Sequence, residues 1–94
     1  IRVNSIMPST VLTKIVDNEV FATVVSNAMN NGQPFETREQ RLEAMNAMIA
    51  SRHMIPRGWV DTRDISEGVL FLASDDAKYI TSEDLRVDLG FAGK

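Results

Sequence analysis

The sequence predicts an α/β fold in which one strand, three helices and a second strand follow one another. A strand-like segment with apolar residues begins the chain and ends at Pro8. A second one follows a helix that ends near residue 74. Between these segments, apolar residues return every three or four positions, which indicates amphipathic helices. Two strands joined by helices should run parallel, with a right-handed crossover.

Composition limits the classes of function. The chain has 94 residues, of which 44% are hydrophobic, and this fits a single globular domain. A net charge of −3 argues against nucleic acid, which requires clustered Lys and Arg. The absence of Cys removes disulfides and thiolate chemistry. No apolar run approaches the roughly 20 residues that span a bilayer, and no signal-peptide pattern opens the chain, so a cytoplasmic protein is expected.

The first strand is expected over Arg2–Met7 and should end at Pro8, which cannot donate a hydrogen bond to a sheet. The first helix is expected over Val16–Asn30. Its apolar stripe consists of Val20, Phe21, Val24, Val25 and Ala28. The sequence Asn30-Asn31-Gly32 should end this helix, because these residues accept a left-handed backbone.

The second helix should begin after Thr37, which forms a capping-box pattern with Gln40. It is expected over Arg38–Ser51, and one face carries Leu42, Met45 and Ile49. The Ile55–Gly58 segment, with its Pro and Gly, then interrupts the regular structure.

The third helix should be capped by Asp61, with Asp64 favourable in its first turn. Its continuous face consists of Ile65, Gly68, Val69 and Leu72. Full burial of the three aliphatic side chains would contribute roughly 4–9 kcal/mol, against about 1 kcal/mol lost at Gly68. Gly68 should therefore mark a close approach to the sheet. The last strand is expected near Ile80 and Leu85–Asp88.

Two stretches, Ile1–Thr13 (IRVNSIMPSTVLT) and Asp64–Thr81 (DISEGVLFLASDDAKYIT), closely resemble the last part of a short-chain dehydrogenase/reductase. In that family, RVN-x-x-x-PG-x-V-x-T ends the sixth strand, and DI-x-x-x-V-x-FLASD-x-A-x-YITG leads into the seventh. The resemblance implies the C-terminal portion of a Rossmann-like, doubly wound parallel sheet. Because the chain opens inside a strand without Met, we expect a carboxy-terminal piece of a longer enzyme. Its parts would be a strand and cofactor turn (1–13), substrate-lid helices (14–60), and the last helix and strand (61–94).

The resemblance implies a segment of an NAD(P)-dependent oxidoreductase that interconverts an alcohol and a carbonyl. In the family, backbone groups at the position of Val11 hold the nicotinamide carboxamide. The hydroxyl at the position of Thr13 bonds the carboxamide or the adjacent phosphate, while Pro8 and Ser9 shape the turn. The alternative is that Ser9 and Thr13 only stabilise a polar turn through bonds to the backbone.

The family's catalytic groups are absent from this chain, which should therefore be inactive on its own. The only Tyr is Tyr79, and the residue four positions later is Glu83, so no Tyr-x-x-x-Lys pair exists. The glycine-rich turn that seats a dinucleotide is absent too. His53 is expected on the surface or lining a pocket rather than in catalysis. Asp75-Asp76 fits a solvated helix end better than a metal site.

By position, Lys14–Met54 matches the family's variable substrate loop, with Gly32 and Pro34 suited to a moving lid. A pocket for a hydrophobic alcohol or ketone is expected to be lined by Ile15, Val16, Phe21, Met45 and Met48. The alternative for each of these residues is ordinary helix packing.

Three residues stand where the family has Gly: Ser9, Ser82 and Leu89. Loss of Gly matters where the backbone needs a positive φ. Ser9, the long lid and the PRGWV run (Pro56–Val60) resemble the carveol-dehydrogenase-like, mycofactocin-coupled branch, which implies tightly held NAD. NADP is not excluded, because the residues that select between the two lie elsewhere in the family fold.

The last helix and strand of the family commonly form a subunit interface about a two-fold axis. That resemblance implies a homo-oligomer, a dimer or homotetramer, with apolar contact from Phe71, Leu89 and Phe91. A second hypothesis is a non-catalytic assembly module. A truncated remnant without function is the third.

Overall fold

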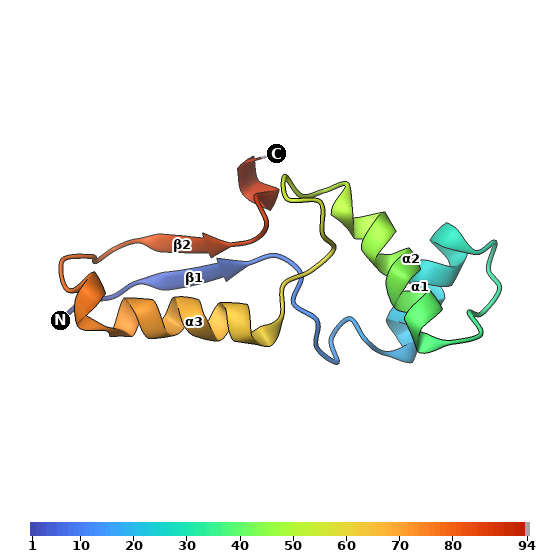
Figure 1. The fold of residues 1–94 in the computed structure, drawn as a ribbon, viewed down its shortest axis with the longest axis horizontal. Coiled ribbons are helices and arrows are strands. Elements are labelled where there is room, and N and C mark those ends of the chain that lie inside the picture. Colours follow the sequence, from blue (N-terminus) through green and yellow to red (C-terminus); the bar gives the residue numbers. More distant parts are fainter. Residues whose placement is uncertain (94) are drawn as a thin grey trace.

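The computed structural model describes residues 1–93; Lys94, the end of the expected 61–94 segment, lies outside them. The chain forms a strand, three helices and a second strand, as predicted (Figure 1). These elements are β1 (Ser5–Pro8), α1 (Glu19–Met29), α2 (Arg38–Ala50), α3 (Thr62–Ala73) and β2 (Asp84–Val87). Short 3₁₀ turns at Asp75–Ala77 and Phe91–Gly93 follow α3 and β2.

The two strands pair in parallel, with Ser5 opposite Asp84 and Pro8 opposite Val87. Pairing continues toward the amino end, where the Ser82 amide donates to the Val3 carbonyl at 2.7 Å. The strand itself begins at Ser5, three residues after the predicted Arg2, and ends at Pro8 as expected. The predicted parallel arrangement is confirmed.

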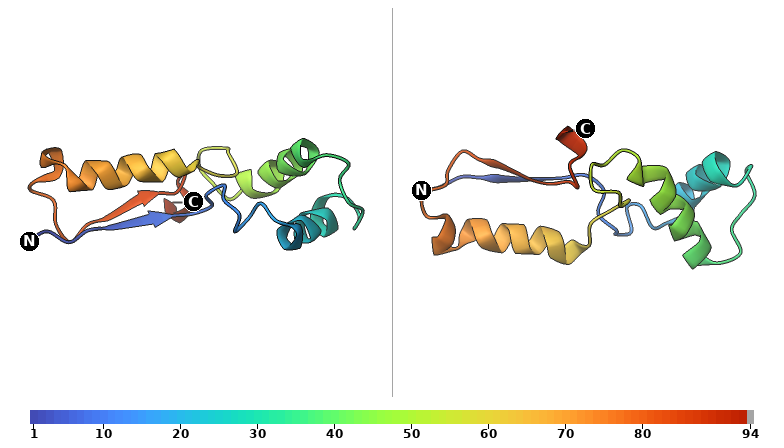
Figure 2. Two further views of the ribbon diagram at one scale, coloured as in Figure 1. Left: turned by 90° about the horizontal axis from the view of Figure 1, so that it is seen from below. Right: turned by 45° about the horizontal axis from the view of Figure 1, so that its top comes forward.

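Helix α3 covers one face of this sheet, as both views in Figure 2 show. A Cβ atom at Gly68 would lie 3.3 Å from Ile6 Cδ1 and 3.4 Å from Val87 Cγ2. The predicted close approach at Gly68 is confirmed, because the absent side chain brings the helix backbone onto the strands. The expected burial of the whole helix face is wrong at Val69, which is 52% exposed, since a two-stranded sheet is too narrow to cover it.

The helices α1 and α2 form a hairpin beyond the carboxyl ends of the strands (Figure 1). Its core is the buried cluster of Val25, Met45 and Ile49, which confirms the predicted apolar face of α2. Helix α1 begins after Asn18, whose side chain accepts from the Phe21 amide at 2.8 Å. The expected start at Val16 was wrong because Asn18 supplies a better cap.

The predicted helix ends depend on particular side chains. Thr37 Oγ1 accepts from the Gln40 amide at 3.1 Å, and an Asp64 carboxylate oxygen accepts from the Asp61 amide at 2.9 Å. After α1, the φ angles are 53° at Asn31 and 81° at Gly32, the left-handed region expected there. Within residues 1–93, no helix has both the length and the apolar character needed to cross a membrane.

Candidate functional site

The post-β1 turn, residues 8–13, lies where β1 ends and the chain crosses toward the helical hairpin (Figure 1). Val11 forms an isolated parallel bridge with Val60, which precedes α3. In this bridge, the Val60 amide donates to the Thr10 carbonyl at 3.0 Å, and the Leu12 amide donates to the Val60 carbonyl at 3.1 Å. Because Val60 bonds the residues on either side of Val11, the amide and carbonyl of Val11 itself point away from Val60.

These two groups of Val11 take no part in a hydrogen bond within residues 1–93. They lie at the carboxyl end of a parallel sheet, the edge at which such sheets bind ligands. An unpaired amide and carbonyl on one residue can bond a group that contains both a donor and an acceptor, such as a carboxamide.

Ser9 is held from two sides. Its Oγ lies 3.1 Å from His53 Nε2 and donates to the Asp88 carbonyl at 3.2 Å. The φ of Ser9 is not among the positive values, so Ser replaces the family's Gly here without backbone strain. The hydroxyl joins the post-β1 turn to the end of β2.

His53 is buried, with 2% of its surface exposed, so the expectation of a surface position was wrong. Its Nδ1 lies 2.6 Å from the Arg57 carbonyl. The ring therefore uses one nitrogen on the backbone and the other on Ser9. No local sequence pattern indicates this contact, because Ser9 and His53 are separated by 44 positions.

Thr13 lies at the end of the turn. Its Oγ1 accepts from the Ile15 amide at 3.3 Å, and its carbonyl accepts from the Val16 and Asp17 amides. The structure thus contains the turn-stabilising bonds that were the alternative explanation for Ser9 and Thr13. The Thr13 hydroxyl still has its own proton to donate.

An ion cluster follows the turn. Asp17 accepts from Arg38 and Arg41, each at 2.5 Å, and so joins the start of α1 to the start of α2. The hydrogen bond from Arg38, and then the charge of both guanidinium groups, holds the pKa of Asp17 below its usual value. The same carboxylate raises the pKa of Arg38. Sequence reasoning missed this cluster, although two Arg three positions apart at a helix start were a visible signal.

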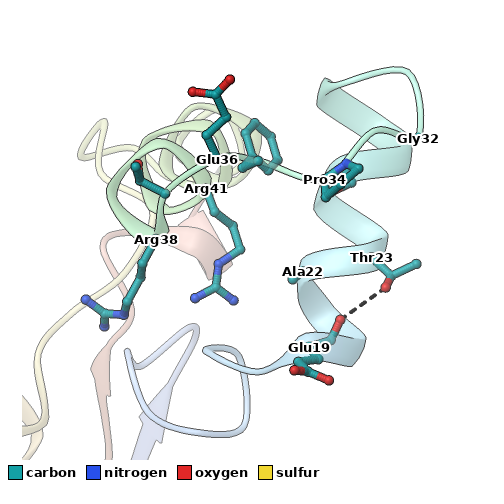
Figure 3. Close-up of a pocket in the computed structure, with 11 residues that line it drawn as sticks. Glu19, Ala22, Thr23, Gly32, Pro34, Glu36, Arg38 and Arg41 are labelled. Carbon is teal, nitrogen blue, oxygen red and sulfur yellow. Dashed lines mark hydrogen bonds between the residues drawn. The ribbon is translucent and has the colours of Figure 1, made fainter.

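A groove of about 620 Å³ lies between α1, the loop after it and the start of α2 (Figure 3). Its lining includes Thr23, Phe35, Arg38 and Arg41. None of the five residues expected to line a substrate pocket borders it. Four of them, Val16, Phe21, Met45 and Met48, belong to the core of the hairpin or pack against it, whereas Ile15 is 83% exposed.

Asp75 and Asp76 are exposed in the 3₁₀ turn after α3. Within the described part of the chain, no three His, Cys, Asp or Glu residues come together in a way that could hold a metal ion.

Known proteins with the same pattern identify the family. A family model described as enoyl-(acyl carrier protein) reductase matches residues 1–92. A short-chain type dehydrogenase/reductase of Mycolicibacterium smegmatis is 39% identical over 90 residues, 96% of this chain. The chain belongs to the short-chain dehydrogenase/reductase family. This confirms the resemblance seen in the two end stretches.

Two relatives of this short-chain dehydrogenase/reductase chain are carveol dehydrogenases. The (−)-trans-carveol dehydrogenase of Rhodococcus erythropolis is 34% identical over 96% of the chain. The crystal structure of carveol dehydrogenase from Mycobacterium avium, in complex with NAD, superposes with a TM-score of 0.81 and 34% identity, covering 99% of the chain. The expected fold, the C-terminal portion of a Rossmann-like sheet, is confirmed. The chain spans 29–31% of the length of these three proteins.

Proposed function

We propose that this chain is the C-terminal part of an NAD(P)-dependent oxidoreductase that interconverts an alcohol and a carbonyl. The single observation that carries the proposal is the orientation of Val11, whose amide and carbonyl are unpaired at the carboxyl end of β1. Membership of the family and the share of the relatives' length support the reading as a segment.

The residues of the post-β1 turn fit a nicotinamide carboxamide. The amide of Val11 would donate to the carboxamide oxygen, and its carbonyl would accept from the carboxamide nitrogen. Thr13 would donate its hydroxyl proton to the carboxamide or to the adjacent phosphate. Pro8 ends the strand and Ser9 anchors the turn, so both hold Val11 in place. The bound nicotinamide supplies the hydride chemistry, and this chain fixes the face of the ring that it offers.

The lid of the enzyme would be the 14–60 segment with its hairpin of α1 and α2. Ile15 is the predicted pocket residue with the most surface available to a substrate. We propose Val16, Phe21, Met45 and Met48 as the packing behind it, so that the pocket wall is apolar. Two carveol dehydrogenases among the relatives support a hydrophobic alcohol or ketone as substrate, with NAD as the nucleotide and NADP not excluded.

The proton-transfer pair would come from outside this chain, since Tyr79 is followed four positions later by Glu83 rather than Lys. The 94-residue chain alone is therefore expected to be inactive. Its apolar surface on α3 supports a second role in assembly, because Leu70 and Phe71 are exposed there and Phe91 is exposed after β2.

The replacement Thr13→Val, in the full-length protein that carries this chain, tests the proposal. Loss of one hydrogen bond to the cofactor should weaken NADH binding by ~0.5–1.5 kcal/mol, or roughly 2- to 13-fold in Kd. Fluorescence titration with NADH measures the effect. Thr23→Val is the matched control, because Thr23 is exposed on α1 and donates within the helix to the Glu19 carbonyl. Equal affinities for wild type and Thr13→Val would count against the role of Thr13.

A further inference from the structure

A short segment connects three parts of the molecule that the chain order keeps apart. We name residues 53–60, between α2 and α3, the strap. Its first residue, His53, bonds Ser9, and its last residue, Val60, exchanges hydrogen bonds with both neighbours of Val11. The strap therefore holds the post-β1 turn at three residues: Ser9, and Thr10 and Leu12 on either side of Val11.

The strap is also fixed to the end of β2. The Ile55 amide donates to the Leu89 carbonyl at 3.0 Å. A Cβ atom at Gly90 would lie 2.7 Å from Met54 Cβ, so the Met54 side chain packs directly on the Gly90 backbone. The post-β1 turn is fixed to the end of β2 as well, because the Asp88 carbonyl accepts from the Ser9 hydroxyl.

The third attachment is to the lid helix α2. The Gly58 amide donates to Asn46 Oδ1 at 2.8 Å. A Cβ atom at Gly58 would lie 2.9 Å from Asn46 Cα, so the strap lies directly on the backbone of α2. A displacement of α2 must therefore move the strap or break this contact.

His53 is the residue at which these attachments meet. The Arg57 carbonyl can only accept, so His53 Nδ1 carries the proton in that bond. Nε2 faces the Ser9 hydroxyl, whose single proton is shared between Nε2 and the Asp88 carbonyl. The Phe91 ring packs edge-on against the imidazole, with 6.1 Å between ring centroids. Because the ring is buried and bonds both the Arg57 carbonyl and Ser9, its orientation is fixed. The imidazole therefore holds the strap and the turn at a fixed separation.

We propose that His53 is a positioning residue that transmits the position of the lid helix α2 to the cofactor turn. Through Ser9, it keeps the amide and carbonyl of Val11 in the orientation that the nicotinamide requires. This inference rests on the proposed function, because it assigns the turn to the cofactor. The role differs from catalysis: His53 acts through Ser9 and touches no reacting atom.

The test uses the full-length protein and three variants. His53→Phe fills the cavity but cannot bond Ser9, and His53→Gln places an amide near the position of Nε2. Ser9→Ala removes the same bond from the other side without changing the buried ring. We expect His53→Phe and Ser9→Ala to raise the Kd for NADH roughly fivefold, and His53→Gln to stay within twofold of wild type. Hydrogen exchange of the amides at residues 9–13, without nucleotide, should quicken in the same two variants.

Ser5→Ala is the matched control, because Ser5 lies on β1 and its hydroxyl bonds the exposed Asp84. It should leave both measurements unchanged. Wild-type affinity and wild-type exchange at residues 9–13 in Ser9→Ala and His53→Phe would overturn the inference. A lower melting temperature with unchanged Kd would assign His53 a merely structural role and would overturn it too. If wild type binds neither NADH nor NADPH, the proposed function fails, and the exchange measurement still decides whether His53 holds the turn.

Discussion

Three residues that replace the family's Gly have different consequences. Ser82 and Leu89 adopt φ angles of 59° and 57°, whereas Ser9 is not in the left-handed region. A left-handed backbone costs a non-Gly residue roughly 1–2 kcal/mol. The sequence could identify the three positions but could not separate the strained two from the unstrained one, since φ is set by the path of the chain around β2.

Ser82→Gly should therefore stabilise the full-length protein. Relief of the strain is partly offset by the extra freedom of Gly in the unfolded chain, about 0.4–1 kcal/mol, so the net gain should lie between about 0 and 1.6 kcal/mol. Thermal or denaturant unfolding measures it. Ser51→Gly is the control: Ser51 is also exposed but has a φ of −65°, and its variant should lose stability. A Ser82→Gly protein less stable than wild type would show that the left-handed backbone costs little here.

The elements themselves were largely predictable because their causes are local. Capping by Thr37 and Asp61, the stop at Asn30–Gly32 and the close approach at Gly68 each follow from one residue's chemistry. The expected burial of Val69 was wrong because it depended on the width of the sheet, which no local pattern records.

The candidate site was also predictable only where its causes are local. Position in the chain placed Val11 and Thr13 on a turn, but the Ser9–His53 bond joins residues 44 positions apart.

The attachment of α1 to α2 should depend on pH through Asp17. Its pKa is lowered in the folded protein, first by the hydrogen bond from Arg38, so the folded state favours the charged form. This contribution to stability is complete above the unfolded pKa of about 4 and is lost as the pH falls through the lowered value. Asp17→Asn should thus lower the melting temperature near neutral pH, and the difference from wild type should disappear in acid.

Asp76→Asn serves as the control, because Asp76 is exposed in the turn after α3 and should leave the melting temperature unchanged. A constant difference between Asp17→Asn and wild type across the acid range would show that the carboxylate charge is not what joins the helices.

The whole chain is more extended than a compact domain of the same length. Its radius of gyration is 16.2 Å, against about 12 Å for a compact domain of this length. Apolar side chains remain exposed at Met7 on β1 and at Val3 just before it. This surface and the 29–31% share of the relatives' length agree with a segment that packs against further sheet.

Part of the apolar surface would serve assembly. Phe71 is 42% exposed on α3, beside the face on which Gly68 meets the sheet. Phe71→Asp should shift the full-length protein to smaller species in size-exclusion chromatography with light scattering, because a buried charge opposes association. Tyr79→Asp is the matched control, since Tyr79 is exposed after α3 and outside that helix. An unchanged oligomer in Phe71→Asp would exclude this face as the interface.

The proposed function requires the post-β1 turn to contact the nicotinamide. Hydrogen exchange of the full-length protein, measured with and without saturating NADH at the amides of residues 9–13, reports on this contact. We expect nucleotide to slow exchange at these amides, and most of all at Val11, because its unpaired amide gains a partner. Unchanged exchange at residues 9–13, in a protein that binds NADH and is protected elsewhere, would contradict contact between the turn and the nicotinamide.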